Sequence, residues 1–254
     1  MKSAGQVDPV DVGNEVGERG REQLLSPTRD FRGALMRTIR SFLALKLNLS
    51  VVERLAEAQK QLWTACRDAG MTIRWIPPPN IHMTMRFLGN VTEPMAFAVK
   101  DMLEPIITKT PVFELETMGI GAFPDTSNPR VIWAGHGQGA EVLGDLHSAI
   151  YNRLLKAGFN LDDKPFRAHV TLGRVKNGPP GAFATCLNDS IPRDFGVSTV
   201  KNLHCYESDL TPRGAEYTSV WVLPFQRGNN NRRSSPTRET PEVPQVVPDD
   251  DKGE

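Results

Sequence analysis

The chain has 254 residues, of which 39% are hydrophobic and 24% charged, values typical of a soluble protein that buries a sizeable core. Its 30 Lys and Arg residues balance 30 Asp and Glu residues, so it lacks the basic excess of proteins that coat long nucleic acids. We find no apolar run of about 18 residues that would predict a membrane span. A basic start followed by an apolar segment, which would predict a secretory signal, is also missing. Three scattered cysteines, Cys66, Cys186 and Cys205, predict no disulfide framework and indicate a cytoplasmic protein.

Both ends of the chain are poor in bulky apolar residues. Residues 1–37 are rich in Gly, Glu, Asp and Arg, and residues 227–254 lead from an Asn- and Arg-rich stretch to a Pro-rich acidic end. Such segments bury too little apolar surface to offset the chain entropy lost on folding. We therefore predict two disordered tails, 1–37 and 227–254, around one folded domain at 38–226. The tails could be tethers or regulatory arms, but solvated extensions without a specific role are the favoured interpretation.

Strands and helices alternate along the predicted domain, as judged from apolar spacings of two and of three to four residues. In chain order we expect a strand at 38–45, a helix from about 50 to 70, strands at 73–76 and 81–88, a helix from about 92 to 103, strands near 113–117 and 130–135, a helix from about 140 to 157, and strands at 166–175, 201–206 and 216–223. Ser50 with Glu53 forms a capping box, Thr92 is a candidate N-cap, and Gly70 and Gly158 are helix stops. Because the order strand, helix, strand, strand recurs, we predict a duplicated α+β unit with a cleft between its halves.

The pattern His-apolar-Thr-apolar occurs at residues 82–85 (His-Met-Thr-Met) and again at 169–172 (His-Val-Thr-Leu). In a strand, side chains two residues apart share a face, so each His and its Thr point one way and the apolar residues the other. Two such strands along a common cleft would present two imidazoles and two hydroxyls to an oxygen-rich ligand, an arrangement suited to acid/base catalysis. Arg86 continues the parity of the first motif and is expected on the same face, without an assigned role.

These motifs and their flanks resemble the two-histidine phosphoesterases, and within them the RNA 2′,3′-cyclic phosphodiesterases, also called 2′-5′ RNA ligases (ThpR/LigT-like). The resemblance covers nearly all of 38–226. Its matching stretches are 40–45, 81–89, 121–124, 129–133, 165–175 and 207–214 with Tyr217. The resemblance implies a bilobal α+β fold in which two antiparallel sheets, related by pseudo-twofold symmetry, surround a central cleft. Helices would lie on the outside, and each lobe would contribute one motif.

The resemblance also implies a substrate, an RNA end with a 2′,3′-cyclic phosphodiester that is opened to a 2′-phosphomonoester. Opening needs a base for the attacking water and an acid for the leaving ribose oxygen. Imidazoles, with a pKa near 6.5, can supply both without a metal, so His82 and His169 are the expected catalytic pair. Thr84 and Thr171 are expected to bind the phosphate, as is Arg174, which matches the arginine of the family's second motif. Strict alternation places Arg174 on the opposite face of the strand from His169. To reach the cleft it must therefore follow a bulge or the strand end, where Gly173 permits the turn.

The other histidines are expected to be solvated or satisfied by hydrogen bonds rather than functional, and two aromatic residues to pack in the core. His136, His147 and His204 lack partners like those of the motif histidines. Phe87 and Trp133 could stack a terminal base, but core packing is favoured for both.

We expect no metal, no cofactor, no membrane contact and no obligate protein partner, and a monomer that acts on RNA 3′ ends, such as tRNA fragments, or on small cyclic phosphates. Three alternatives stay open: 2′-5′ RNA ligation, hydrolysis of a small cyclic nucleotide phosphate, and an RNA-end-binding module with little catalysis. The sequence also leaves open which histidine is the acid and which the base.

Overall fold

The computed structural model describes residues 37–162, 164–188, 191–212 and 214–227. The predicted tails, 1–37 and 227–254, lie outside these residues apart from Arg37 and Arg227. The elements in chain order are β1 (Thr38–Leu45), α1 (Leu49–Asp68), β2 (Thr72–Trp75), the 3-10 helix η1 (Pro78–Asn80), β3 (Met83–Thr92), α2 (Glu93–Ile107), β4 (Phe113–Phe123), β5 (Val131–His136), α3 (Ala140–Lys156), β6 (Val170–Asn177), α4 (Ala182–Cys186), β7 (Asp194–Val200), β8 (Asn202–Thr211) and β9 (Gly214–Pro224).

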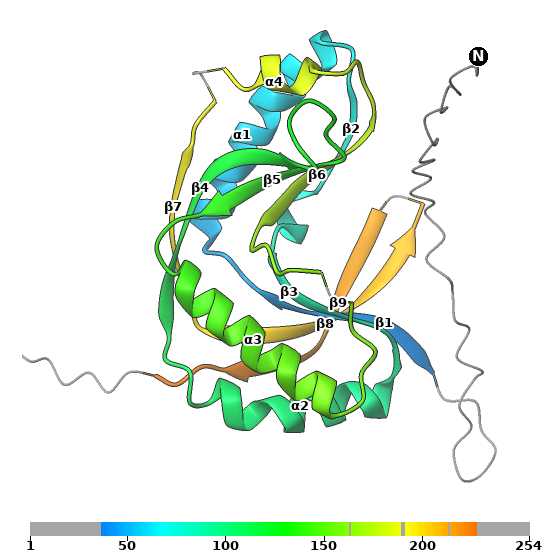
Figure 1. Ribbon diagram of the computed structural model, residues 1–254, viewed down its shortest axis with the longest axis vertical. Coiled ribbons are helices and arrows are strands. Elements are labelled where there is room, and N and C mark those ends of the chain that lie inside the picture. Colours follow the sequence, from blue (N-terminus) through cyan, green and yellow to red (C-terminus); the bar gives the residue numbers. More distant parts are fainter. Residues whose placement is uncertain (1–36, 163, 189–190, 213, 228–254) are drawn as a thin grey trace, which may run out of the picture.

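The nine strands of the described residues pair in the order β7-β4-β5-β6-β3-β1-β8-β9, and β2 adds to β6. The pairing is antiparallel throughout, but the two central strands, β3 and β6, share only one residue pair, Met83 with Val170. From that pair the upper half (β2, β4–β7) and the lower half (β1, β3, β8, β9) curve apart (Figure 1). The predicted pair of antiparallel sheets is therefore present as two halves that are continuous at a single point.

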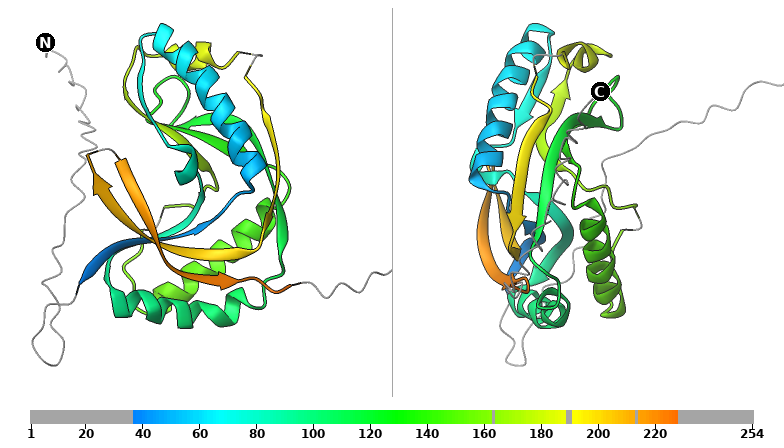
Figure 2. Two further views of the ribbon diagram at one scale, coloured as in Figure 1. Left: turned by 180° about the vertical axis from the view of Figure 1, so that it is seen from behind. Right: turned by 90° about the vertical axis from the view of Figure 1, so that its left-hand side faces the viewer.

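The two halves follow the predicted pseudo-twofold relation. Counting outward from the central pair, β3 corresponds to β6, β1 to β5, β8 to β4 and β9 to β7. The helices obey the same relation, because α1 and α3 follow β1 and β5, and α2 and α4 follow β3 and β6. Helix α1 packs against β2, β7 and α4, and α2 against β9 and α3. Seen from behind, α1 covers the outer surface of the upper half (Figure 2). The predicted α+β fold with outer helices is confirmed.

The apolar residues of both motifs lie in the main core. Met83, Met85, Val170 and Leu172 are buried together with Leu43 of β1. Residues three and four apart on α1 complete this core. The alternation predicted within each motif is therefore present: the apolar side chains face the core, and the His and Thr side chains face away from it.

Most element positions agree with the sequence, but several differ. Strand β1 is confirmed, as is Thr92, whose hydroxyl accepts a hydrogen bond from the Met95 amide at the start of α2. The capping box at Ser50 is wrong, because α1 begins earlier with Asn48 as its N-cap. Helix α2 continues to Ile107, beyond the predicted end. Helix α4 and strand β7 were not predicted.

Candidate active site

The two motif histidines lie directly before the residue pair that joins the halves of the sheet. Met83 and Val170 are fully buried and face the core. In an antiparallel register, the residues flanking this pair stand opposite one another, His82 across from Thr171 and Thr84 across from His169. All four side chains then share the face away from the core. The register thus brings together the four motif residues that the sequence singled out.

Each imidazole is fixed by the same local hydrogen bond. Nδ1 of His82 lies 2.7 Å from the Asn80 carbonyl oxygen, and Nδ1 of His169 lies 2.6 Å from that of Arg167. A carbonyl can only accept, so Nδ1 carries the proton and donates in both rings. The Thr84 hydroxyl, 3.0 Å from Nε2 of His82, then donates to that nitrogen. In the neutral rings Nε2 is therefore the unprotonated nitrogen, and it is available for proton transfer.

Aromatic side chains hold both rings in place. His82 stacks on Phe42 at a centroid distance of 5.0 Å and meets the edge of Tyr217 at 5.3 Å. His169 meets Phe123 edge-on at 5.0 Å. Such contacts restrict ring rotation, so they preserve the orientation set by the carbonyl groups.

The surroundings favour the neutral form of both histidines. Burial lowers the pKa of His82 below its ordinary value, the Asn80 carbonyl raises it, and the charge of His169 lowers it. Burial also lowers the pKa of His169, the Arg167 carbonyl raises it, and the charges of Arg174 and His136 lower it. His82 therefore senses the charge of His169, so a protonated His169 disfavours protonation of His82.

Arg174 reaches the cleft because β6 contains a bulge. Thr171 and Gly173 pair with successive residues of β5, so Leu172 has no partner there. The extra residue reverses the alternation, which leaves Leu172 and Gly173 buried and Arg174 exposed. The bulge expected near Gly173 is present, and the charge of Arg174 acts on both His169 and Tyr217. Its binding of phosphate remains a prediction.

A matching bulge in β3 overturns two expectations. Thr84 and Arg86 pair with successive residues of β1, so Met85 is the extra residue. Arg86 consequently turns away from the cleft, where simple alternation had placed it. Its side chain is 9% exposed, and its Nη2 lies 2.9 Å from both the carboxylate and the carbonyl oxygen of Asp162. Phe87, for which core packing was favoured, is 58% exposed and lies 5.9 Å from the Phe42 ring.

The remaining histidines differ in their relation to the site. His147 stacks on Phe166 at 4.0 Å, and His204 on Tyr206 at 5.6 Å, so both have packing contacts. His136 lies close enough to influence His169 electrostatically. Trp133, for which core packing was favoured, is half-buried and pairs with Thr171, so it lies on the face of the motif residues, where it packs against Phe123 at 5.2 Å.

Tyr217 is a cleft residue to which the sequence analysis gave no role. Besides its contact with His82, its ring meets that of Phe42 edge-on at 5.0 Å. Burial raises the pKa of the phenol, whereas the charges of Arg174 and Arg40 lower it. The phenol therefore stays protonated at neutral pH and can donate a hydrogen bond to a bound oxygen. Its only signal in the sequence was its place among the flanks that resemble the family.

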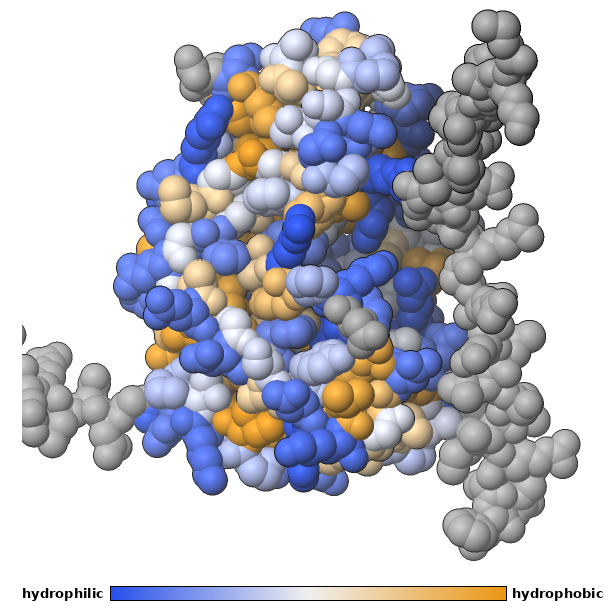
Figure 3. Space-filling model, in the orientation of Figure 1, coloured by the Kyte–Doolittle hydropathy of each residue, from blue (hydrophilic) through white to orange (hydrophobic). Residues whose placement is uncertain are grey.

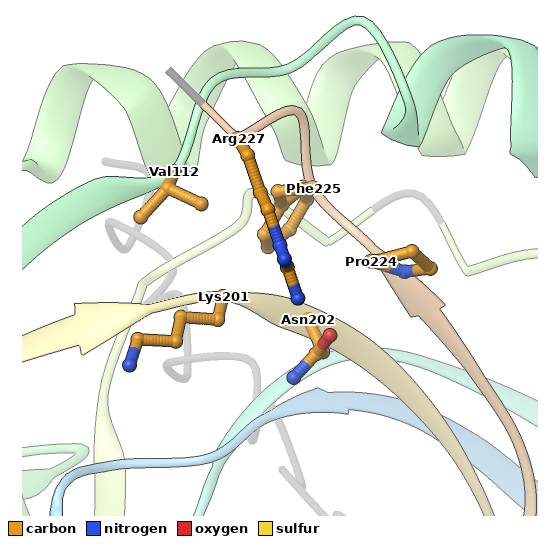
Figure 4. Close-up of a pocket in the computed structure, with 6 residues that line it drawn as sticks. All are labelled: Val112, Lys201, Asn202, Pro224, Phe225 and Arg227. Carbon is orange, nitrogen blue, oxygen red and sulfur yellow. The ribbon is translucent and has the colours of Figure 1, made fainter. Parts of the chain in front are cut away.

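The surface between the two halves of the sheet is hollowed, right of centre in the space-filling view, and mainly hydrophilic (Figure 3). A separate cavity of about 410 Å³ lies elsewhere, where β8 begins and β9 ends (Figure 4). It is lined by Val112, Lys201, Asn202, Pro224, Phe225 and Arg227. At a rise of roughly 3.3 Å per residue, the β9 end of this cavity is some 20 Å along the strand from Tyr217. The predicted site residues do not line it.

Two further properties bear on the expected cofactors and membrane contacts. Within the ranges that the structure describes, no three His, Cys, Asp or Glu side chains gather as a metal-binding group. None of the helices in those ranges is long and apolar enough to cross a membrane.

Comparison with known proteins supports the resemblance. The family model for LigT-like phosphoesterases matches residues 45–133 and 136–217. A protein of Archaeoglobus fulgidus named RNA 2′,3′-cyclic phosphodiesterase is 33% identical over 186 residues, which cover 73% of this chain and 99% of the relative. One of the same name from Aquifex aeolicus is 31% identical over 73% of this chain and 96% of its own length.

Solved structures show the same architecture. A protein of Thermus thermophilus has a TM-score of 0.60 and 27% identity, over 75% of this chain and all of its own. E. coli LigT in complex with 3′-AMP has a TM-score of 0.59 at 22% identity, over 74% of this chain and 99% of its own, a likeness of fold alone. Together with the family match over most of the predicted domain, these likenesses show that the chain belongs to the LigT-like phosphoesterase family.

Proposed function

We propose that this chain is an RNA 2′,3′-cyclic phosphodiesterase that opens the cyclic end of an RNA to a 2′-phosphomonoester. The observation that carries the proposal is the matched pair of imidazoles, one from each half of the sheet, with Nδ1 fixed on a backbone carbonyl and Nε2 left for chemistry. The names of the relatives from Archaeoglobus fulgidus and Aquifex aeolicus support the substrate class.

The reaction needs one proton removed and one supplied on opposite sides of phosphorus. Nε2 of one histidine takes a proton from water as the water oxygen bonds to phosphorus. Nε2 of the other gives a proton to the 3′ oxygen as its bond to phosphorus breaks. Each positioned transfer is typically worth about 10²–10⁴ in rate. The rings end with exchanged protonation states, and exchange with solvent restores them.

The state of the free cleft fits this cycle. Both rings are biased toward the neutral form by burial, so the base is ready before the substrate binds. The bound phosphodiester anion raises the pKa of the nearby rings, because a neighbouring negative charge favours protonation. One ring then takes up the proton that it later donates, while the mutual repulsion of the imidazoles keeps the other neutral.

Thr84, Thr171 and Arg174 complete the proposed site around the non-bridging oxygens. The Thr84 hydroxyl, which donates to Nε2 of His82, can turn to a phosphate oxygen when the substrate binds. Arg174 supplies the fixed positive charge that stabilises negative charge as it builds up in the transition state. Acid, base and cation are all side chains, so we propose that the reaction needs no metal.

We further propose that the enzyme acts as a monomer on RNA 3′ ends in the cytoplasm. The three cysteines are free and buried, which suits a reducing compartment.

An assay of the purified protein in EDTA tests the proposal. A 2′,3′-cyclic oligonucleotide should be converted to the 2′-phosphate, with the product identified by its resistance or sensitivity to position-specific phosphatases. Joining of two RNAs through a 2′-5′ bond, with a terminal hydroxyl in place of water, would assign ligation instead. Retention of the cyclic end, with and without added divalent metals, would contradict catalysis and leave an RNA-end-binding module.

A further inference from the structure

Two arginines face each other across neighbouring strands beside the proposed site. Arg74 of β2 pairs directly with Arg174 of β6, and both side chains are exposed. Their strand neighbours Ile73, Trp75 and Val175 pack against the core, so the arginines point to the opposite face, the one that carries the motif histidines. Residues directly opposite in an antiparallel pair have Cβ atoms about 4.5–5.5 Å apart, and like charges in this arrangement are destabilising.

No carboxylate in the described part of the chain neutralises these two charges. The ion pairs found there join Arg37 with Glu207, Lys60 with Glu57, Arg67 with Asp68 and Arg86 with Asp162. An unneutralised pair of cations beside a catalytic cleft is a binding site for anions.

The β8–β9 hairpin bounds this pair on one side. The Asn80 amide, next to the first motif, donates to the Ala215 carbonyl at 2.7 Å and so ties the hairpin to the cleft. A Cβ built on Gly214 would lie 3.4 Å from Nη2 of Arg74, so the guanidinium reaches the hairpin tip. A ligand that leaves the histidines along this wall therefore passes Arg174 and then Arg74.

We propose that Arg74 binds a second phosphate, the phosphodiester on the 5′ side of the terminal ribose, while Arg174 serves the phosphate that reacts. This inference rests on the proposed function. We assign Arg174 to the reacting phosphate because it lies close enough to His169 and Tyr217 for its charge to act on both. Arg74 stands one strand further out, where an RNA chain places its next negative charge.

The consequence is a preference in substrate class. A cyclic mononucleotide without a 5′ phosphate offers Arg74 nothing to bind, whereas every RNA end of two or more nucleotides does. The arginine pair therefore makes this protein an enzyme of RNA ends rather than of small cyclic nucleotides.

The test compares Arg74→Gln with the native protein on two substrates, a 2′,3′-cyclic mononucleotide and a dinucleotide with the same cyclic terminal nucleotide. For the dinucleotide, kcat/KM should fall about tenfold or more, mainly through KM, because a charged hydrogen-bonding partner is lost. For the mononucleotide it should change by less than about twofold, since Arg74 touches no part of that substrate. Equal losses on both substrates, or no loss on either, would overturn the inference.

Arg67→Gln is the matched control, because Arg67 is an exposed arginine on α1 that pairs with Asp68 and stacks on Trp63, outside the cleft. It should change neither substrate's kinetics. The thermal midpoint of Arg74→Gln in phosphate-free buffer should be no lower than that of the native protein, because the substitution relieves repulsion. A clearly lower midpoint would assign Arg74 a structural role instead.

Equilibrium binding separates this inference from the proposed function. The ligands are a nucleoside 2′-phosphate and a dinucleotide with a terminal 2′-phosphate. A native protein inactive on both substrates would contradict the phosphodiesterase proposal. A dinucleotide preference in binding that disappears in Arg74→Gln would still establish the second phosphate site, and binding without any such preference would refute it.

Discussion

The imidazole of His82 and that of His169 have the same hydrogen-bonded tautomer, and each is indispensable if one is the acid and the other the base. We expect His82→Ala and His169→Ala each to lower kcat by at least about 100-fold on a 2′,3′-cyclic oligonucleotide, the lower range for a positioned proton transfer. Single-turnover kinetics measures the loss directly.

His204→Gln is the control for these two variants, since it also removes an imidazole but from β8, where the ring stacks on Tyr206. It should retain native turnover. Near-native turnover in either motif variant would remove that histidine from the mechanism.

The charge of Arg174 offers a second prediction at this scale. Burial is the largest cause of the lowered pKa of His169, and Arg174 lowers it further. In Arg174→Gln that repulsion is gone, so the pKa of His169 in the free enzyme should rise, although it should stay below its ordinary value. NMR titration of the His169 ring measures the change without any substrate. Arg174→Lys keeps the charge and should show little shift; an unchanged or lower pKa in Arg174→Gln would place the guanidinium away from the ring.

The site residues show how far alternation along a strand can be trusted. His82, Thr84, His169 and Thr171 were placed correctly on one face, because each motif is short and its apolar residues are fully buried. Arg86 and Phe87 depend on the bulge at Met85, which adds one residue to β3 before a second register shift follows Phe87. Nothing in the local sequence marks that bulge, whereas Gly173 signals its counterpart in β6. The swap of Arg86 and Phe87 between interior and cleft follows from this one residue.

At the scale of elements, the bulge of β6 is what presents Arg174, and Gly173 is what allows it. A Cβ on Gly173 would come within 2.8 Å of the Ile73 side chain and 3.0 Å of Trp75, both on β2. Gly173→Ala should therefore push β2 from β6, lower the free energy of unfolding by about 1–3 kcal/mol and reduce kcat/KM about tenfold or more. Urea unfolding and steady-state kinetics test the two effects.

Gly144→Ala is the matched substitution, because Gly144 lies inside α3 and its Cβ would meet nothing within 4 Å. It should leave activity unchanged and stabilise the protein by about 0.5–1 kcal/mol, as expected for alanine in a helix interior. Native stability and activity in Gly173→Ala would show that β2 yields without cost.

The elements that the sequence missed depend on distant partners. The start of α1 is set by Asn48 rather than by the capping box at Ser50. The backbone N–H of Asn48 donates a hydrogen bond to the Ser198 hydroxyl of β7 at 3.0 Å. Strand β7 is itself an edge strand with a glycine of positive φ at Gly196, which weakens its pattern. By contrast, β1 is paired on both sides, with β3 and β8, and ends in a continuous buried run from Phe42 to Leu45, so its limits were predicted correctly.

At the scale of the whole molecule, buried neutral histidines make the fold sensitive to acid. Burial, with the charge of Lys46, lowers the pKa of His204 to about 4 from a value of 6.5. Between these values the unfolded chain binds a proton that the folded protein does not, so stability is full above pH 6.5 and is lost as pH falls toward 4. His204 alone can account for up to about 3 kcal/mol of this loss.

Urea unfolding measured from pH 7 to pH 4 tests this expectation. The free energy of unfolding should decrease with acid, and His204→Gln should show a smaller decrease than the native protein. His82, His147 and His169, whose pKa values are also lowered, would supply the remainder. An equal decrease in His204→Gln would mean that its ring titrates alike in the folded and unfolded chains.

The equivalent anchoring of the two imidazoles has a consequence for the direction of the reaction. Two rings with equivalent Nδ1 hydrogen bonds, on strands related by a pseudo-twofold axis, do not by themselves determine which way round a ribose phosphate binds. Groups that differ between the two halves must determine it, and one such difference is at the fifth position after each histidine, where one half of the sheet offers the ring of Phe87 and the other the guanidinium of Arg174. The aromatic ring on one side and the cation on the other therefore favour one orientation of the bound ribose phosphate.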